Sequence, residues 1–166
     1  MKIYFALIAA AILMMSVACS NKNTKTREEK VAEFRNSLTE TDTLEMLKIC
    51  DTAMEHLKSK HIEDVLASLY EYNDSTQEVK PLSEEVAKKY RRTFTIYPVL
   101  EYTRKYYSFQ LEGCNDVKYD VVFATAEQAG TKEPAKTAYM FNPVKVDGQW
   151  FLCVKTASDE IDETRQ

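Results

Sequence analysis

The chain is short of the residues that define several protein classes. It has only three glycines and four prolines in 166 residues, which excludes a collagenous or low-complexity chain. Lysine and arginine number 22 against 26 aspartates and glutamates, for a formal net charge of −4. Because nucleic-acid binding needs a basic surface that releases counterions, this balance argues against a nucleic-acid partner. Two histidines and four cysteines leave little material for a metal site, and we assign no metal and no cofactor.

The remaining composition is that of one globular domain. Hydrophobic residues make up 45% of the chain and charged residues 29%. The length fits a single domain rather than two. These proportions predict a chain that buries a core, and they identify no activity.

The N-terminus has the pattern of an export signal. Lys2 precedes an uncharged, almost wholly apolar run over 3–15. This run is shorter than the ~20 residues that a membrane-spanning helix needs. The sequence Ser-Val-Ala-Cys follows at 16–19, and then a polar segment. We therefore predict a signal peptide over 1–18, with a retained N-terminal anchor helix as the alternative.

Two kinds of cleavage fit these residues. A small residue, then Cys19 and a polar tether resemble the lipobox of bacterial lipoproteins, although Ser16 stands where leucine is usual. Ordinary signal cleavage after Ala18 fits as well. We favour the lipoprotein, and expect a lipid anchor on Cys19 and a lipidated polar tether over 19–40. The expected location is the bacterial cell envelope, at the outer rather than the inner membrane.

We expect one folded domain over 41–157. Apolar residues at helical spacing predict helices in its first half. The main helix is expected from Thr41 or Asp42 to about Lys58, with a possible short helix before it from Arg27. Its apolar stripe consists of Met46, Leu47, Cys50, Ala53, Met54 and Leu57. Two more helices are expected, over about 62–70 and between Pro81 and Pro98, with a loop at 73–75 between them.

From Val99 the apolar period changes to two, which predicts strands. Four are expected, over 99–111, 117–127, 135–146 and 149–156. In the first hairpin Leu111 is expected to pair with Val117. The second hairpin turns at Asp147-Gly148, a strong hairpin signal. We expect a flexible tail over 158–166.

The two faces of the second hairpin differ in their expected surroundings. One face carries Tyr139, Phe141, Trp150, Leu152 and Val154. The other carries Met140, Val144, Val146, Phe151 and Cys153. Helices followed by a four-stranded antiparallel sheet form an α+β layer pattern, and helices on one side can cover only one of these faces.

This order of elements resembles the NTF2-like (cystatin-like) superfamily over roughly 41–156. The closing hairpin, Val-Asp-Gly-Gln-Trp-Phe-Leu at 146–152, carries much of the resemblance. Together with the lipidation signal, the chain is similar to small NTF2-like lipoproteins of Bacteroidetes-type bacteria. The resemblance implies a sheet curled around the helices and a cone-shaped pocket. Superfamily members include isomerases, dehydratases, cyclases and binding domains, so the resemblance selects no function.

Four tyrosines are candidates to line such a pocket: Tyr70, Tyr90, Tyr107 and Tyr119. Ketosteroid-isomerase-like members use an Asp base with Tyr and protonated Asp as oxyanion donors. We find no matching set here and assign no catalytic residue. The simpler interpretation is that these tyrosines are amphipathic core residues.

The histidines and cysteines give no clear site. His56 and His61 lie five residues apart, we find no third ligand near them in the sequence, and we interpret both as partly exposed structural residues. We expect no disulfide among Cys50, Cys114 and Cys153, with a Cys50–Cys153 bridge kept open if Cys153 faces the helices.

Three functions stay open. We favour a binding or accessory module that takes a small ligand or an envelope protein, because an acid/base set is missing. The alternatives are an isomerase- or cyclase-like enzyme and a structural subunit that dimerises through its sheet. We expect a homodimer or partner to cover Met140, Val144, Val146 and Phe151. The competing account is that the sheet curls, or the segment around Phe34 folds back, to cover this face within one chain.

Overall fold

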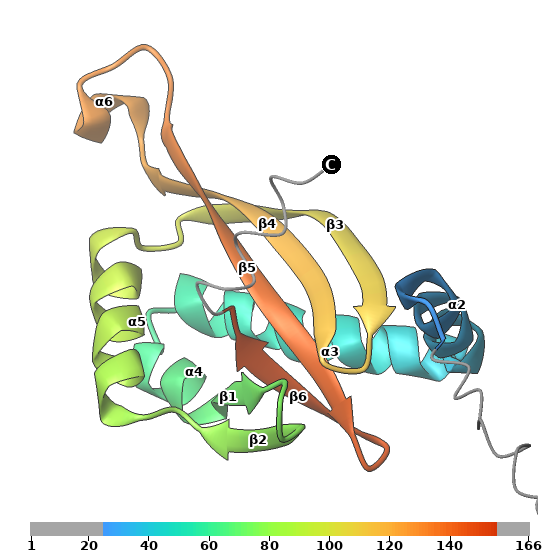
Figure 1. Cartoon of the computed structure of the whole chain (residues 1–166). Helices are drawn as coiled ribbons and strands as arrows, with labels where there is room; N and C mark the ends of the chain where they lie inside the picture. Colours follow the sequence, from blue (N-terminus) through green and yellow to red (C-terminus); the bar gives the residue numbers. More distant parts are fainter. Residues whose placement is uncertain (1–24, 156–166) are drawn as a thin grey trace, which may run out of the picture.

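The computed structural model describes residues 25–155 (Figure 1). Its helices are α2 (Arg27–Ser37), α3 (Glu40–Lys58), α4 (Ile62–Ser68), α5 (Glu84–Ile96) and the short α6 (Ala126–Ala129). Its strands are β1 (Leu69–Asn73), β2 (Glu78–Pro81), β3 (Glu101–Leu111), β4 (Cys114–Ala124), β5 (Ala135–Val146) and β6 (Gln149–Val154). The expected signal peptide, Cys19 and the tail over 158–166 lie outside the described residues. Over 25–155, no helix is long and apolar enough to cross a membrane.

The strands of the described residues form one sheet, in the order β2-β1-β6-β5-β4-β3. Neighbours are antiparallel except β1 and β6, which run parallel. The prediction of four antiparallel strands is therefore wrong, because the sheet has six strands and is mixed. The α+β class holds: Figure 1 shows α3 running across one face of a curved sheet, with α2 beside β3.

The two unpredicted strands, β1 and β2, lie on either side of the predicted loop, and β1 replaces the predicted end of a helix. Helix α4 ends at Ser68, two residues before its predicted end. Leu69 and Tyr70 then pair with Leu152 and Cys153 of β6. Leu69 stays buried in the core beside Leu152, so the chain keeps this apolar residue covered after it leaves the helix. The pairing with a strand more than 80 residues away decides the local structure here, over a sequence whose spacing also suits a helix.

Helix α3 begins earlier than predicted and buries five of the six residues of the predicted stripe, while Leu47 is half-buried. Its N-cap is Thr39, not Thr41 or Asp42. The Thr39 hydroxyl accepts the Asp42 backbone N–H, and the Asp42 carboxylate accepts the Thr39 backbone N–H at 2.8 Å. This reciprocal pair is a capping box, with aspartate in the place of the usual glutamate. The buried apolar residues of the helix are Met46, Cys50, Ala53, Met54 and Leu57, as expected.

Helix α2 confirms the expected short helix from Arg27 and places part of the predicted tether against the sheet. Phe34 is buried in the main hydrophobic core, which we call the core cluster and which also contains Met46 and Leu57 of α3 and Phe141 and Trp150 of the second hairpin. The Arg35 guanidinium donates to the Phe109 carbonyl of β3 at 2.7 Å. The segment around Phe34 therefore folds back onto the domain, beside β3, but Phe34 packs into the core and no contact of it with the face of Met140, Val146 and Phe151 is seen among the described residues.

The register of the first hairpin differs from the prediction and shifts along the ladder. Leu111 pairs with Cys114, three residues before its predicted partner Val117, and Val117 pairs with Tyr107. Register shifts lie between Arg104 and Tyr106 and between Phe109 and Leu111, so Arg104 pairs with Tyr119 and lies on the same face of the sheet. Val117 and Tyr119 are buried. Strand β4 ends at Ala124, before the predicted end, because the capped turn of α6 follows.

The second hairpin confirms its predicted register and core face. Val146 pairs with Gln149, and Asp147 and Gly148 both have positive φ (50° and 81°). Such a turn matches the twist of the strands that it joins. The five residues of the predicted core face are all buried in the core cluster: Tyr139, Phe141, Trp150, Leu152 and Val154.

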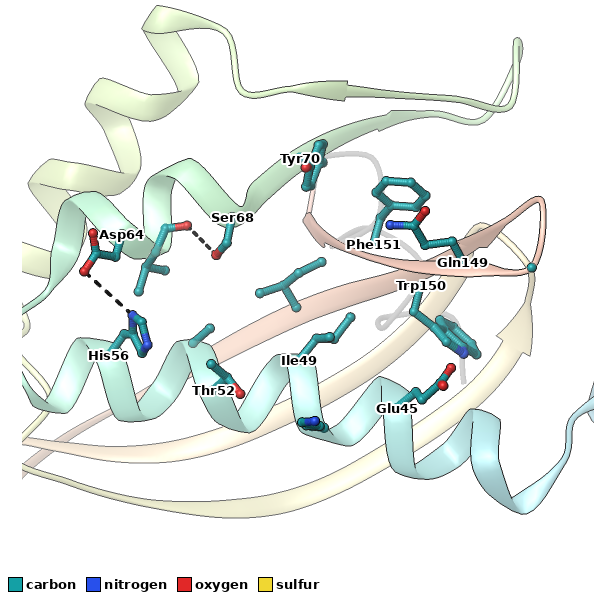
Figure 2. Close-up of a pocket in the computed structure, with 15 residues that line it drawn as sticks. Glu45, Ile49, Thr52, His56, Asp64, Ser68, Tyr70, Gln149, Trp150 and Phe151 are labelled. Atoms are coloured by element: carbon teal, nitrogen blue, oxygen red, sulfur yellow. Dashed lines mark hydrogen bonds and ion pairs between the residues drawn. The ribbon is translucent and has the colours of Figure 1, made fainter.

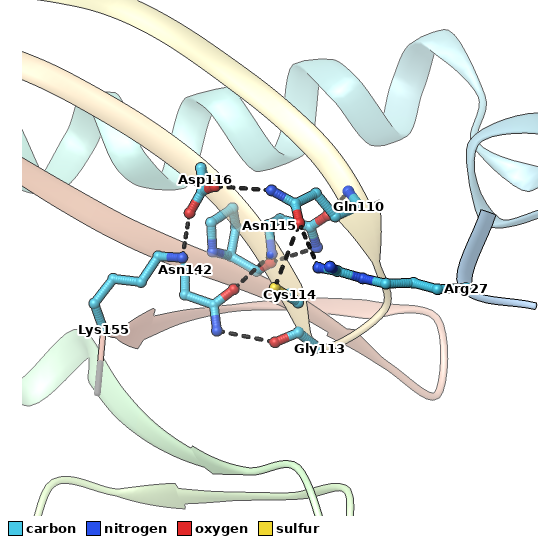
Figure 3. Close-up of polar contacts among 9 residues, drawn as sticks. Arg27, Gln110, Gly113, Cys114, Asn115, Asp116, Asn142 and Lys155 are labelled. Carbon is cyan, nitrogen blue, oxygen red and sulfur yellow. Dashed lines mark hydrogen bonds and ion pairs between the residues drawn. The ribbon is translucent and has the colours of Figure 1, made fainter. Parts of the chain in front are cut away.

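A polar cluster bridges β4 and β5 where their ladder ends. We call Asn115, Asp116, Asn142 and Lys155 the sheet cluster (Figure 3). The ladder stops at Val117↔Phe141, and Pro143 has no N–H with which to continue it in an internal strand.

Side-chain amides supply the missing hydrogen bonds. The Asn142 side chain accepts the Asn115 backbone N–H at 2.8 Å and donates to the Gly113 carbonyl at 3.0 Å. The Asn115 amide donates to the Pro143 carbonyl at 2.8 Å. Because Asn115 and Asn142 are buried, these bonds keep polar backbone groups from being left unpaired in the interior.

The charged half of the sheet cluster is buried as well. Lys155 forms an ion pair with Asp116, and their side chains are only 9% and 11% exposed. The Gln110 amide donates to the second Asp116 oxygen at 3.1 Å. Both charges therefore have partners within the chain, which a buried ion pair requires.

Candidate functional site

A groove lies between α3 and α4 on one side and β1 and β6 on the other (Figure 2). Its volume is about 680 Å³, and small-molecule sites usually measure about 300–1,000 Å³. Helix α3 contributes Glu45, Lys48, Ile49, Thr52, Ala53 and His56. Helix α4 and β1 contribute Asp64, Val65, Ser68 and Tyr70, and the second hairpin contributes residues 148–152.

The spacing of the α3 residues explains why this side of the helix faces a groove. Ile49, Thr52, Ala53 and His56 follow the i, i+3, i+4, i+7 pattern of one helix face. This face lies beside the core stripe and shares Ala53 with it. The groove therefore has an apolar floor where it meets the core and polar residues toward solvent.

The second hairpin forms an aromatic wall whose position is fixed by contacts behind it. The Trp150 indole N–H donates to Asp42 Oδ1 at 3.4 Å, and Lys145 forms an ion pair with the same oxygen. The hydrogen bond from Lys145, together with those from Thr39, holds the pKa of the Asp42 carboxyl well below its usual value. On the neighbouring side, Phe151 packs edge-on against Tyr70, with ring centroids 5.3 Å apart.

The far end of the groove is polar. His56 Nδ1 lies 4.0 Å from Asp64 Oδ2, and His61 Nδ1 lies 3.9 Å from the same oxygen. The two imidazole rings meet edge-on at 5.9 Å. Three metal-ligating side chains thus converge at this end, and we call them the His–Asp cluster. His56 and Asp64 line the groove, and His61 lies just outside it.

Of the four tyrosines named from the sequence, only Tyr70 lines the groove. Tyr90 lies on α5, where its hydroxyl donates to the Lys155 carbonyl at 3.3 Å. Tyr107 lies on β3 and is 46% exposed, and Tyr119 lies on β4 and is fully buried in the core. The four tyrosines that we proposed for one pocket therefore lie in four different places in the fold.

The four residues named as an interface are also divided. Val144 is fully buried within the chain, while Met140, Val146 and Phe151 are half-buried. Phe151 belongs to the groove wall. A surface for a second copy would therefore rest on Met140, Val146 and the exposed part of Phe151, without Val144.

A tyrosine and a carboxylate do meet in the fold, outside the groove. The Tyr119 hydroxyl donates to Asp51 Oδ1 at 2.6 Å, and Arg104 forms a salt bridge with Asp51 Oδ2 at 2.9 Å. Burial, and then the bond to Asp51, raise the pKa of Tyr119. Neither Tyr119 nor Asp51 lines the groove, and the Asp51 side chain is 43% exposed. This pair gives no general acid or base to a ligand bound in the groove.

The described cysteines are thiols rather than disulfides. Burial raises the pKa of Cys50 and raises that of Cys153 to about 12. A thiol with a raised pKa stays protonated and is a poor nucleophile. The bridge between Cys50 and Cys153, which the sequence left open, is not formed.

Sequence reasoning missed most of the groove and the third member of the His–Asp cluster. Asp64 stands only three residues after His61, so the spacing contained a usable signal. The groove itself is formed by two segments, over 45–70 and 148–152, that lie far apart in the chain. One of its walls includes β1, whose parallel pairing with β6 was not predicted.

Comparisons with known proteins give a likeness of overall structure. No protein-family model matches the sequence, and no curated protein matches it. The chain is similar to a solved structure named as an NTF2-like transpeptidase from Campylobacter jejuni, at 12% identity and a TM-score of 0.41, over 65% of this chain and 96% of that one. It is also similar to a calcium/calmodulin-dependent protein kinase II association domain from Xanthomonas campestris, at 13% identity and a TM-score of 0.40, over 73% and 91%.

The first of these structures bears the name of the superfamily that the sequence resembles. The comparisons do not test the narrower resemblance to Bacteroidetes-type lipoproteins. They assign no ligand or activity to the groove.

Proposed function

We propose that the chain is a lipoprotein of the bacterial cell envelope whose folded part binds a small ligand in the groove. The groove carries this proposal. Its volume of about 680 Å³, apolar floor and few polar groups at the rim are the features of a small-molecule site. Ala53, Val65 and Leu152 offer an apolar surface to the body of a ligand, while Lys48 and Gln149 can contact its polar groups.

A binding role fits the groove better than an isomerase- or cyclase-like activity. Such enzymes need a base and an oxyanion donor that touch the reacting atoms. Tyr70 is the tyrosine that lines the groove, and no hydrogen bond joins it to Glu45 or Asp64 among the described residues. Two tyrosine–carboxylate pairs of the described residues, Tyr119 with Asp51 and Tyr102 with Glu55, lie outside the groove.

The groove can be tested with a reporter already present in the chain. Trp150 is the only tryptophan and forms part of the groove wall, so its fluorescence should respond to a bound molecule. We expect native mass spectrometry of the purified full chain to show a retained small molecule. We also expect anilinonaphthalene sulfonate to bind at one site and to quench Trp150.

A matched pair of variants makes this test specific. Thr52→Phe adds a ring inside the groove, and Leu44→Phe adds one at a position on α3 that is 61% exposed and outside the groove. Thr52→Phe should weaken probe binding at least about tenfold, or ~1.4 kcal/mol, while Leu44→Phe should leave it unchanged. Equal binding by both variants, or no binding by the wild type, would contradict the proposal.

The anchor is tested separately, through Cys19→Ala. A lipid chain contributes ~0.8 kcal/mol per buried CH₂, and two or more chains hold a protein stably at a membrane. We therefore expect the wild type in the membrane fraction, with a mass increase on Cys19, and the variant in the soluble envelope fraction. If both proteins are soluble and Cys19 is unmodified, the chain is exported without a lipid anchor.

A further inference from the structure

The three side chains of the His–Asp cluster are brought together by a tight turn between α3 and α4. Lys60 has a left-handed backbone (φ 63°), and the His61 N–H donates to the His56 carbonyl at 2.8 Å. This reversal places His61 beside His56 although the two are five residues apart. Asp64 follows one helical turn later and points back to both rings.

The arrangement leaves ligand atoms that are close but unbonded. The His56, His61 and Asp64 ligand atoms all lie within 4.8 Å of one another. The two histidine–aspartate distances, 4.0 and 3.9 Å, are longer than a hydrogen bond. Exposed ion pairs of this kind contribute little to stability. The cluster thus has donor atoms that neither a hydrogen-bond network nor the core uses.

We infer that His56, His61 and Asp64 bind one Zn²⁺ ion at the end of the groove. Imidazole nitrogen and carboxylate oxygen are zinc ligands, with bonds of about 2.0–2.2 Å. Tetrahedral geometry then requires ligand atoms about 3.4 Å apart. The three side chains are 43%, 60% and 65% exposed. Small rotations of these side chains close the remaining distance without disturbing the core.

Three protein ligands leave the fourth zinc position open. Sites with three protein ligands and one exchangeable ligand are those in which zinc contacts a substrate or another molecule. Because His56 and Asp64 line the groove, the open position lies at its end. There the metal binds an anionic or nitrogen-donor group of a molecule held in the groove. This last step rests on the proposed function, whereas binding of the metal does not.

The metal alone tests the site. The full chain, purified in detergent and stripped with EDTA, is titrated with Zn²⁺ by calorimetry and with Co²⁺ by visible absorption. We expect one ion per chain and the absorption of tetrahedral Co²⁺. Loss of an outer-shell partner of a metal ligand typically costs about 10- to 100-fold in affinity. His56→Gln, His61→Gln and Asp64→Asn should each therefore weaken Zn²⁺ binding at least about 100-fold.

Glu63→Gln is the matched control. It removes a carboxylate next to Asp64, one that pairs with Arg91 and takes no part in the cluster. Its affinity for Zn²⁺ should stay within about threefold of the wild type, since it changes only an exposed charge. Circular dichroism verifies that every variant is folded.

Two results would overturn the site: no Zn²⁺ binding at millimolar metal, or binding that all three substitutions leave intact. The outcome is separable from that of the proposed function. Zinc binding without a groove ligand leaves the metal site standing alone. If a probe binds in the groove but the chain has no affinity for zinc, the proposed function is supported and the metal site is rejected.

Discussion

The sheet cluster and the His–Asp cluster are both small groups of polar side chains, but they lie in opposite surroundings. In the sheet cluster, Asn115 and Asn142 are buried and bonded to the chain itself, and Asp116 and Lys155 neutralise each other. In the His–Asp cluster, all three side chains are more than 40% exposed, and no hydrogen bond joins them.

This difference separates a structural role from an available site. A buried polar group must be satisfied within the fold, because leaving it unpaired costs the full desolvation penalty. The sheet cluster therefore repairs the interrupted ladder at Pro143 and has little left to offer a ligand. The side chains of the His–Asp cluster form no hydrogen bond with one another, so their donor atoms remain available to a metal or a groove ligand.

The largest expected effect comes from breaking the buried charge pair. Lys155→Met leaves Asp116 as a buried charge without its cation, which typically costs about 3–5 kcal/mol of unfolding free energy. Replacing both partners, as in Asp116→Leu with Lys155→Met, should recover most of that loss, because neither charge then remains. Urea unfolding of the two variants and the wild type measures both effects.

The outcome distinguishes a buried pair from a surface one. A loss below 1 kcal/mol in Lys155→Met would show that water reaches Asp116, and the comparison between the clusters would fail. If the double variant is less stable than Lys155→Met, the loss of stability comes mainly from losing the ion pair and not from leaving Asp116 as an unpaired charge.

The periodicity of the sequence correctly predicted structural features that depend on a single helix or hairpin, such as which of its faces is buried. The α3 stripe and the core face of the second hairpin are correct because a helix of period 3.6 and a strand of period two each have one buried side. The two strands of the first hairpin were predicted, but their register was not, because Leu111 pairs with Cys114 and the ladder has two register shifts within β3.

Features that need two distant segments were not predicted. Leu69 and Tyr70 continue the spacing of α4, but they pair with Leu152 and Cys153 of β6, and Tyr70 also pairs with Pro81 of β2, so they form a strand. Of the residues that line the groove, the sequence analysis proposed only Tyr70 as a pocket residue, and it assigned Phe151 to an interface. The expected homodimer stays a prediction, now without Val144, which the chain itself covers.

An intermediate effect is expected at Asp42, which stands behind the groove wall. Its side chain is as buried as that of Asp116, at 11% exposed, but its partner Lys145 is 24% exposed. Asp42→Asn removes a charged partner of Lys145 and should cost about 1.5–3 kcal/mol near pH 7. The pKa of Asp42 is lowered in the folded state, chiefly by its bond to Lys145. Its contribution is therefore complete above the unfolded pKa of about 3.9 and is lost as pH falls toward the folded pKa.

Unfolding free energies of wild type and Asp42→Asn between pH 7 and pH 2 measure this dependence. The difference between the two proteins should stay constant from pH 7 to about pH 5 and shrink below it. A difference that does not change with pH would mean that Asp42 acts through its cap geometry alone, without the charge.

The smallest expected effect on stability is at the His–Asp cluster. Exposed substitutions away from core contacts, caps and strained backbone usually change the unfolding free energy by no more than about 0.5 kcal/mol. His56→Gln and Asp64→Asn should fall within that range when measured without metal, and so should the two combined. The same variants are expected to lose most of their Zn²⁺ affinity, so in the presence of Zn²⁺ only the wild type should gain stability, in proportion to ln(1 + [Zn²⁺]/Kd). A metal-free loss above 1 kcal/mol would assign these side chains a structural role, and the contrast with the sheet cluster would then be one of degree.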